Sequence, residues 1–253
     1  GGLVWDAAVV LTDHILAREA DWRIKEGNKY DEINSCSTKI VDLGAGVGIA
    51  GLAIAKALPR TEVHITDLPE LMPIMTRNVV RNFEDNAVVK ISPGTSTEGR
   101  VYTRNERGFA ASDIPLCTDR GCKDLSQDDI LSLHRASDEE KLKTMKHSEG
   151  KVMAKVLRWG MKEDYGSDPY DVVIGADVVT SLYDPEALAH TIHSLCHEDS
   201  RVYMSLKNRL KEVIVQFEEV MHQLFSSVTM VKAISRNKNE DIIVMEVFGK
   251  KKR

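Results

Sequence analysis

The chain has 253 residues, of which 42% are hydrophobic and 29% charged, a composition typical of a soluble globular protein. Its formal net charge of −5 argues against a general nucleic-acid-binding protein, because such proteins are normally basic. No apolar run approaches the ~20 residues that a membrane helix needs. We therefore expect one globular domain over residues 1–253, monomeric and without a nucleic-acid or membrane partner.

Four cysteines are scattered along the chain, too few for a disulfide framework, which favours a reducing compartment. Cys117 and Cys122, with His134 and His147 downstream, could be imagined as a zinc site. Their spacing is loose for zinc and the segment is polar, so we favour free thiols and expect no metal. We expect a cytoplasmic protein; the basic residues 250–253 are a weak indication of nuclear targeting as well.

Apolar spacing predicts strands that alternate with helices. Helical periodicity marks residues 3–20, 49–58, 71–82, 186–196 and 207–224, and short β-rich runs mark residues 39–43, 62–66, 151–157, 170–176 and 201–206. Two further strands, residues 228–234 and 241–248, follow each other across a polar turn and are expected to be antiparallel neighbours. The pattern predicts the α/β class: a seven-stranded mixed sheet, mostly parallel, with an antiparallel C-terminal strand and helices on both faces.

Two segments stand outside this alternation. Residues 1–38 are predicted to form an N-terminal helical segment. Residues 92–150 are polar, with Gly, Ser, Thr and mixed charges, and a loop of this length inside a compact domain is uncommon. We interpret this region as an insertion in one domain, serving either as a mobile loop or as a holder of a partner.

A glycine-rich turn, K-I-V-D-L-G-A-G-V-G-I-A-G-L-A-I-A at residues 39–55, joins the first predicted strand to the next helix. Gly44, Gly46 and Gly48 allow positive φ and the close approach of a ligand to bare backbone. The start of the helix adds unpaired N–H groups and a partial positive charge. The turn therefore predicts a site for a nucleotide-like cofactor.

Two carboxylates narrow the choice of cofactor. Asp67 ends the second predicted strand, where an acid can bind both hydroxyls of a ribose. That arrangement also suits NAD, but Asp42, two residues before Gly44, would repel a pyrophosphate. S-adenosylmethionine (SAM) carries a sulfonium and an ammonium group and no phosphate. Charge complementarity therefore favours SAM over NAD.

These motifs resemble those of a known family. D-L-G-A-G-V-G at residues 42–48 and T-D-L at 66–68 resemble the class I, seven-β-strand SAM-dependent methyltransferases. Four further blocks are similar to the methyltransferase-like protein-lysine methyltransferases: V-W-D-A-A at 4–8, R-N-V-V-R-N at 77–82, A-K-V-L-R-W-G at 154–160 and G-A-D-V-V at 175–179. The nearest branch acts on valosin-containing protein, an AAA ATPase; others act on heat-shock chaperones and elongation factors. The resemblance covers nearly the whole chain outside the insertion and implies a Rossmann-like fold.

The resemblance also implies roles for individual residues in holding SAM. Those residues are Trp5 against the methionine end, Gly44, Ala45 and Gly46 beneath it, Asp67 on the ribose, Leu68 and Trp159 around the adenine, and Ala176 by its backbone. The two tryptophans could instead be core aromatics. Asn78 and Asn82 are expected to make structural bonds rather than bind a ligand.

Methyl transfer from SAM is an in-line displacement that needs no enzyme nucleophile, but the lysine must arrive neutral. Asp177, at the C-terminal end of a predicted parallel strand, stands where open α/β sheets place their chemistry. Members of the resembling group usually show D-x-x-Y here. In this sequence Thr180 takes the place of the tyrosine and Tyr183 follows three residues later. We favour a short insertion that keeps Tyr183 in the role, so Asp177 and Tyr183 are the predicted catalytic residues.

The leading hypothesis is a SAM-dependent protein-lysine N-methyltransferase that acts on a non-histone protein of the chaperone, AAA ATPase or elongation-factor type. A catalytically silent SAM-binding interaction protein is the main alternative. A small-molecule methyltransferase stays open, because fold does not determine substrate. An NAD-dependent oxidoreductase is the most distant alternative.

Overall fold

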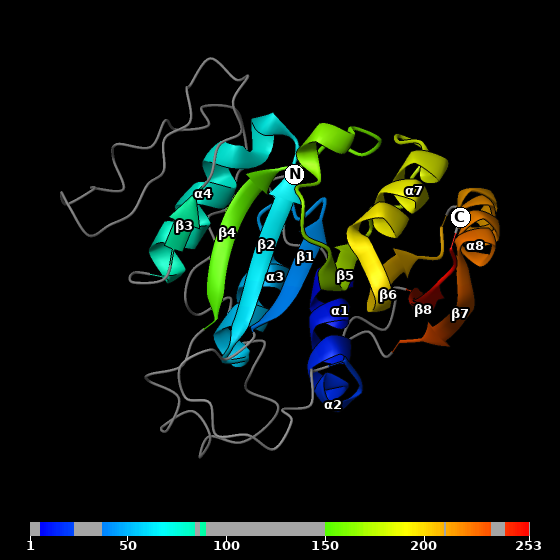
Figure 1. The fold of residues 1–253 in the computed structure, drawn as a ribbon, viewed down its shortest axis with the longest axis horizontal. Helices are drawn as coiled ribbons and strands as arrows, with labels where there is room; N and C mark the ends of the chain where they lie inside the picture. The colour runs from blue at the N-terminus through cyan, green and yellow to red at the C-terminus, as the bar shows by residue number, and fades with distance from the viewer. Residues whose placement is uncertain are drawn as a thin grey trace.

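The computed structural model describes residues 6–22, 37–83, 87–89, 150–209, 211–233 and 241–252. Its strands are β1 (Thr38–Leu43), β2 (Thr61–Asp67), β3 (Ala87–Val89), β4 (Lys151–Val156), β5 (Tyr170–Ala176), β6 (Cys196–Lys207), β7 (Phe225–Lys232) and β8 (Ile242–Lys250). They form one sheet in the order β3-β4-β2-β1-β5-β6-β8-β7 (Figure 1). Trp5 and nearly all of the predicted insertion lie outside the described residues.

The mixed character of the sheet is confirmed. Every neighbouring pair from β3 to β6 is parallel, whereas β8 is antiparallel to both β6 and β7. The C-terminal strand is therefore antiparallel as predicted, but it lies between β6 and β7, and β7 forms the edge. The short β3, which apolar spacing did not indicate, brings the strands among the described residues to eight, one more than predicted.

The helices agree with the predicted order. They are α1 (Asp6–Ala17), α2 (Glu19–Trp22), α3 (Ile49–Ala57), α4 (Met72–Asn82), α7 (Pro185–Leu195) and α8 (Lys211–Leu224), with short 3-10 turns η1 (Pro69–Leu71) and η3 (Lys162–Asp164). Several predicted boundaries were wrong: β6 begins at Cys196 rather than at residue 201, and β7 spans Phe225–Lys232 rather than residues 228–234. The first predicted helix is split after Ala17, and α8 begins at Lys211 because β6 continues to Lys207.

Apolar side chains from alternate strand positions fill a separate core on each face of the sheet. Ile40 and Ile174 pack with residues of α1, α3 and α4, whereas Val41 and Val173 pack with residues of α7 and α8. Helices therefore cover both faces of the central strands, as Figure 1 shows. This double burial explains why β1 and β5 carry consecutive apolar residues, at 40–41 and 172–174, instead of a strict alternation of apolar and polar residues.

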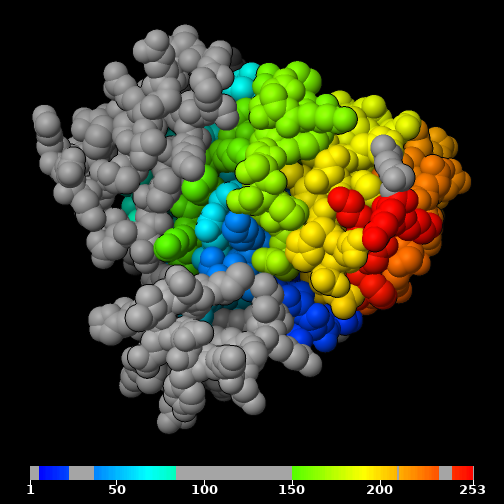
Figure 2. Space-filling model, viewed as in Figure 1, coloured from blue at the N-terminus to red at the C-terminus, as the bar shows by residue number. Residues whose placement is uncertain are grey.

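The C-terminal residues are bonded to the rest of the fold. Lys250 Nζ donates to the carbonyl oxygen of Cys196 at 2.7 Å, and Lys251 Nζ donates to that of His222 at 2.7 Å. Figure 2 shows this segment, in red, between the yellow segment that holds α7 and the orange segment that holds α8 and β7. None of the helices among the described residues has the length and apolarity to cross a membrane.

The cysteine prediction can be compared with the structure at one position. Cys196 is a free, buried thiol, and burial raises its pKa to about 12. Cys36, Cys117 and Cys122 lie outside the described residues, as do His134 and His147. The described ranges contain no cluster of three or more His, Cys, Asp or Glu side chains arranged to hold a metal ion.

Candidate functional site

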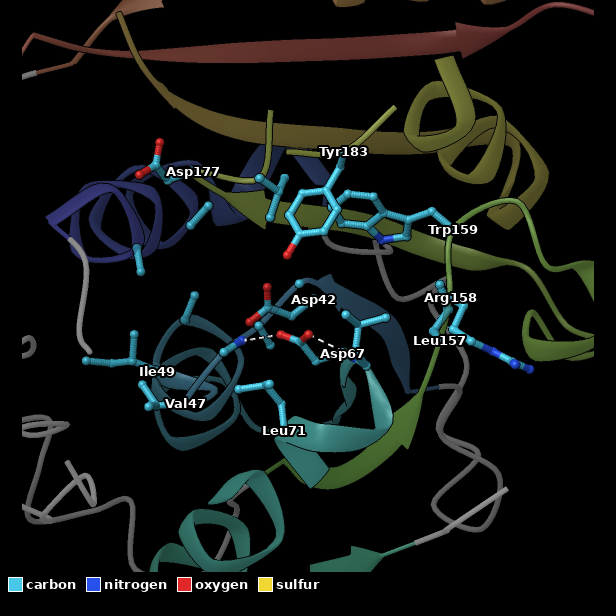
Figure 3. A pocket seen from close by; sticks show the side chains of 18 of the residues that line it. Asp42, Val47, Ile49, Asp67, Leu71, Leu157, Arg158, Trp159, Asp177 and Tyr183 are labelled. Atoms are coloured by element: carbon cyan, nitrogen blue, oxygen red, sulfur yellow. Dashed lines mark hydrogen bonds between the residues drawn. The ribbon is translucent and has the colours of Figure 1, made fainter. Parts of the chain in front are cut away.

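A cavity of about 530 Å³ opens at the carboxyl ends of β1, β2, β4 and β5 (Figure 3). Parallel pairing aligns these ends, since Leu43 is in register with Thr66 on one side and Gly175 on the other. The predicted site residues that the structure describes all line this cavity: Asp42, Gly44, Ala45, Gly46, Asp67, Leu68, Trp159, Ala176, Asp177 and Tyr183. Trp5 is the one predicted site residue outside the described ranges.

The glycine turn has the backbone conformation that the sequence predicts. Gly44, Gly46 and Gly48 have φ angles of 61°, 59° and 86°. A Cβ atom added to Gly44 would lie 2.7 Å from Cγ1 of Val178, so a side chain there would displace the neighbouring wall. A Cβ atom on Gly46 would meet nothing within 4 Å. The absence of a side chain at Gly46 therefore leaves space in the cavity that a ligand can fill.

Polar bonds hold this turn in place. The backbone N–H of Ala45 donates to the carbonyl of Thr66 at 2.9 Å, which joins the turn to the end of β2. From α4, Asn78 Nδ2 donates to the carbonyl of Val47 at 2.8 Å. Asn82 Nδ2 donates in turn to the carbonyl of Asn78. The prediction that both asparagines are structural is confirmed.

Asp42 lies at the buried side of the cavity, with only 1% of its surface exposed. It shares the strand face of Ile40, which points toward α3, and its Oδ2 accepts a hydrogen bond from the N–H of Gly51 at 3.0 Å. The first turn of α3 gains an acceptor in this way, because Gly48 at the N-cap has no side chain to supply one. Asp42 therefore has a structural bond that the sequence did not predict.

Burial also changes the protonation of Asp42. Desolvation raises its pKa to about 7, the bond from Gly51 opposes that rise, and the charge of Asp67 adds to it. A cation placed in the cavity would favour the ionised carboxylate and lower this pKa again. The acid therefore fits a positively charged ligand better than a phosphate-bearing one.

Asp67 uses both of its carboxylate oxygens to hold the cavity wall. Oδ2 accepts from the N–H of Gly46 at 2.8 Å, and Oδ1 accepts from the N–H of Leu68 at 2.7 Å (Figure 3). Burial raises the pKa of Asp67, and these two bonds act against the rise. Each carboxylate oxygen has a second lone pair. The side chain can therefore accept a further hydrogen bond on each oxygen, as a ribose diol requires.

Two aromatic rings form one end of the cavity. Trp159 and Tyr183 meet edge to face, with ring centroids 5.2 Å apart and an interplanar angle of 74°. Among the described residues that line the cavity, Tyr183 is present and Thr180 is not. The Thr180 hydroxyl instead accepts from the N–H of Leu182 at 3.2 Å. Asp184 then caps α7, because its side chain accepts from the N–H of Glu186 at 2.9 Å.

The loop after β4 is fixed by contacts that the sequence did not reveal. Gly160 has a φ of 82°, and its N–H donates to Thr191 Oγ1 at 2.9 Å and to the Tyr165 hydroxyl at 3.0 Å. Arg158 donates from Nε to Asp164 at 2.7 Å, and this guanidinium lowers the pKa of the buried acid. These bonds set the position of the indole that lies between Arg158 and Gly160.

Asp177 follows β5 in a left-handed conformation, with a φ of 55°, which is uncommon for a residue other than glycine and occurs often at functional sites. Its N–H donates to the carbonyl of Ser205 at 2.8 Å, which fixes the backbone. Its carboxylate points away from Asp42 (Figure 3) and accepts from Nη2 of Arg209 at 2.9 Å. Arg209 is 32 residues away in sequence, and nothing in its local pattern predicts this contact.

Further residues complete the wall. They are Ala8, Val47, Ile49, Ala50, Leu71, Leu157, Arg158, Val178, Asp184 and Ala187. Several of them are direct sequence neighbours of predicted residues, so their position beside the glycine turn, Trp159 and Tyr183 could have identified them. Ala8 and Ala187 are three and four positions along the sequence from Trp5 and Tyr183, a weaker signal of the same kind.

Solved structures of methyltransferases share this fold. The glycopeptide N-methyltransferase MtfA in complex with SAM matches with a TM-score of 0.50 and 8% identity, over 96% of this chain and 94% of that one. A predicted O-methyltransferase from Agrobacterium tumefaciens matches with a TM-score of 0.50 and 12% identity, over 98% of this chain and 82% of that one. At these identities the likeness concerns the fold alone.

Curated relatives are more informative about activity. EEF1A lysine methyltransferase 3 of Xenopus tropicalis is 22% identical over 245 residues, which cover 96% of this chain and 73% of that protein. The mouse protein of the same name is 24% identical over 206 residues, 81% of this chain and 55% of that protein. Protein-lysine N-methyltransferase EFM6 of Saccharomyces cerevisiae is 30% identical over 87 residues, 31% of this chain and 33% of that protein.

The family comparison covers most of the domain. A family described as lysine methyltransferase matches residues 1–93 and 135–224, more than half of the chain. Together with the named relatives, this match confirms the predicted enzyme class and SAM as the cofactor. The chain therefore belongs to the lysine methyltransferase family.

Proposed function

We propose that this chain methylates a lysine side chain of a non-histone protein of the elongation-factor type. One observation carries the proposal: the glycine turn and Asp67 line the same cavity as Asp177 and Tyr183, which lie across it from Asp67 (Figure 3). A cofactor cradle, an acid and an aromatic ring therefore line the same ligand space. Because the Xenopus and mouse relatives are named as EEF1A lysine methyltransferases, we choose this elongation factor rather than a chaperone or an AAA ATPase as the first substrate to test.

The cavity offers a partner for each part of SAM. Asp67 would accept the two ribose hydroxyls, the backbone from Gly44 to Gly46 would lie under the methionine part, and Asp42 would supply the negative charge. Leu68 and Trp159 offer apolar surface for the adenine, and Ala176 a backbone contact. When bound, SAM supplies a methyl group on a sulfonium that a neutral amine can accept in an in-line displacement.

The remaining task of the protein is to position and deprotonate the lysine. Tyr183, with Trp159 against its ring, would form an apolar wall that displaces water from the amine. Desolvation lowers the pKa of a lysine, because it disfavours the charged form. Asp177, whose side chain is 8% exposed, would orient the amine. Positioning and desolvation supply the catalysis, so the reaction needs no side-chain nucleophile.

The direct test is methylation of bacterially produced, unmethylated EEF1A by the purified protein with isotope-labelled SAM. Mass spectrometry would locate the labelled lysine. The matched control is Asp177→Asn, which keeps the shape of the side chain and should bind SAM while labelling far more slowly. Binding of SAM without labelling of EEF1A or of any protein in a native lysate would favour the catalytically silent alternative. Label found only in small molecules would favour a small-molecule methyltransferase.

We further propose that the protein is a cytoplasmic monomer. The acidic net charge and the bonds that hold Lys250 and Lys251 to carbonyl groups of the domain support the cytoplasm over a basic nuclear signal. Light scattering of the purified protein tests the oligomeric state, and a second species of twice the mass would contradict it. Imaging of the tagged protein in cells tests the compartment, and a mainly nuclear signal would contradict it.

A further inference from the structure

Arg209 places a positive charge in contact with the proposed acceptor acid. Its Nη2 lies 2.9 Å from Oδ2 of Asp177. The Asp177 side chain is 8% exposed and the Arg209 side chain 52% exposed, so the pair stands at the border between the protein interior and solvent. Coulomb attraction between such charges is screened less than it would be at an open surface.

The turn that bears Arg209 is itself held to the sheet. The N–H of Asn208 donates to the carbonyl of Asp241 at 2.9 Å, and Asn208 Nδ2 donates to the carboxylate of Asp241 at 2.8 Å. The N–H of Arg209 donates to the carbonyl of Lys207 at 2.7 Å. The guanidinium therefore extends from an anchored backbone, which limits how far it can move from Asp177.

From this geometry we infer that Arg209 is a positioning residue that keeps the target lysine deprotonated by offsetting the negative charge of Asp177. The inference rests on the proposed function, because it requires a lysine amine beside Asp177. A buried carboxylate alone would stabilise the ammonium form of that lysine and raise its pKa. The adjacent guanidinium opposes this effect, so Asp177 can accept a hydrogen bond from the amine without holding its proton.

The proton balance shows why this matters for the rate. The lysine ammonium, with an ordinary pKa of ~10.4, first loses one proton to solvent. The lone pair freed on nitrogen forms the new bond to the methyl carbon, and the electron pair of the broken carbon–sulfur bond stays on sulfur. Below the pKa of the bound lysine, the neutral fraction falls about tenfold for each unit by which that pKa rises. The charge beside Asp177 therefore acts directly on the rate at neutral pH.

Other charges near the cavity do not take the place of Arg209. The remaining titratable or charged side chains that line it are Asp42, Asp67, Arg158, Tyr183 and Asp184. Arg158, the cation among them, is paired with Asp164 at 2.7 Å and points out of the cavity (Figure 3). Lys207, at the end of β6, and Asp241, which accepts hydrogen bonds from Asn208, carry opposite charges next to the turn of Arg209. Arg209, by contrast, is a cation that directly contacts the acid at the acceptor end.

The test compares pH–rate profiles of the wild-type protein, Arg209→Gln and the matched control Arg209→Lys. Single-turnover methylation of EEF1A with saturating SAM, from about pH 7.5 upward, makes the observed rate report the chemical step. We expect Arg209→Gln to be about tenfold slower at the lowest pH and its profile to shift upward by about one pH unit, with rates that converge at high pH. Arg209→Lys should follow the wild type. Calorimetric SAM affinity should be unchanged in both variants, because Arg209 does not line the cavity.

Convergence at high pH separates a charge effect from a structural one. Equal slowing of Arg209→Gln at every pH would mean that the side chain only holds geometry, and would overturn the inference. An equal shift in Arg209→Lys would overturn it as well, because the positive charge is retained there. If the wild-type protein methylates EEF1A but the pH–rate profile of Arg209→Gln does not shift, this inference is refuted and the proposed function stands. Failure of the wild-type protein to methylate would refute the proposed function, and the inference with it.

Discussion

SAM binding should be coupled to the loss of a proton from Asp42. The carboxyl group is 1% exposed, and burial raises its pKa to about 7 from an ordinary value of 3.8. At about pH 6 the ligand-free protein therefore carries Asp42 mainly as the neutral acid. A sulfonium or ammonium group in the cavity favours the carboxylate, so binding and deprotonation assist each other.

The size of the effect follows from the two pKa values. If the pKa of Asp42 returns to its ordinary 3.8 in the complex, SAM should bind about 16-fold more tightly at about pH 7 than at about pH 5.5. That ratio corresponds to about 1.6 kcal/mol. At about pH 6, binding should release about 0.9 proton per SAM molecule.

Isothermal titration calorimetry measures both quantities. Titrations in two buffers of different ionisation enthalpy give the number of protons released, and the pH series gives the affinity. The range stays at or below about pH 7, because an α-amino group titrates near ~7.7–8.0 and would add its own proton. Asp42→Asn is the matched control, since its side-chain oxygen can still accept from Gly51. This variant should bind more weakly at pH 7 and show a flat pH dependence.

Two results would refute the reasoning. A wild-type affinity that is independent of pH between 5.5 and 7 would show that Asp42 does not face the cation. A slope that persists in Asp42→Asn would assign the proton to another group, such as Asp67, whose pKa is also raised by burial.

The same shift predicts how the ligand-free protein responds to pH. Between about pH 4 and 7, Asp42 is protonated in the folded protein but ionised in the unfolded chain. Its contribution to the unfolding free energy is therefore fully present at low pH and is lost as the pH rises through about 7. The contribution amounts to about 4 kcal/mol, from a shift of about three pKa units. Chemical denaturation at pH 5 and at pH 8 measures this contribution. The unfolding free energy should fall less between the two pH values in Asp42→Asn than in the wild type, and an equal fall in both proteins would contradict this prediction.

Three further tests use substitutions in and next to the cavity. Asp67→Ala should weaken SAM binding by about 1–3 kcal/mol, because charged hydrogen bonds are lost; unchanged affinity in calorimetry would refute its ribose role. Tyr183→Ala should reduce turnover of EEF1A at least tenfold while Thr180→Ala stays near wild type, and the reverse ranking would return the aromatic role to position 180. The unfolding free energy of Gly44→Ala should be lower than that of Gly46→Ala by about 1–3 kcal/mol, because only the alanine at position 44 would meet a neighbouring side chain. Gly46→Ala should instead mainly weaken SAM binding. Equal stability and affinity of the two variants would contradict the packing argument.

Local pattern sufficed for most of the fold and for much of the site. The consecutive apolar residues within β1 and β5 are enough to identify buried strands, and the glycines at 44, 46 and 48 indicate by themselves a backbone with positive φ. The end of β6 was misjudged because Lys207 fits a helix start and a strand end equally well in sequence. The three-residue β3 was missed because so short a run carries too little periodicity.

By itself, the sequence determined that a cofactor approaches the backbone between two elements, that an acid stands on each side of that approach, and that the chain follows the pattern of one methyltransferase family. Those properties are local, because they depend on residue type and spacing within a few positions. The tertiary structure alone decided that Tyr183 rather than Thr180 reaches the cavity, that Asp42 bonds to Gly51, and that Arg209 meets Asp177. Each of these depends on how separate strands and helices pack, and a contact across 32 residues leaves no trace in local spacing.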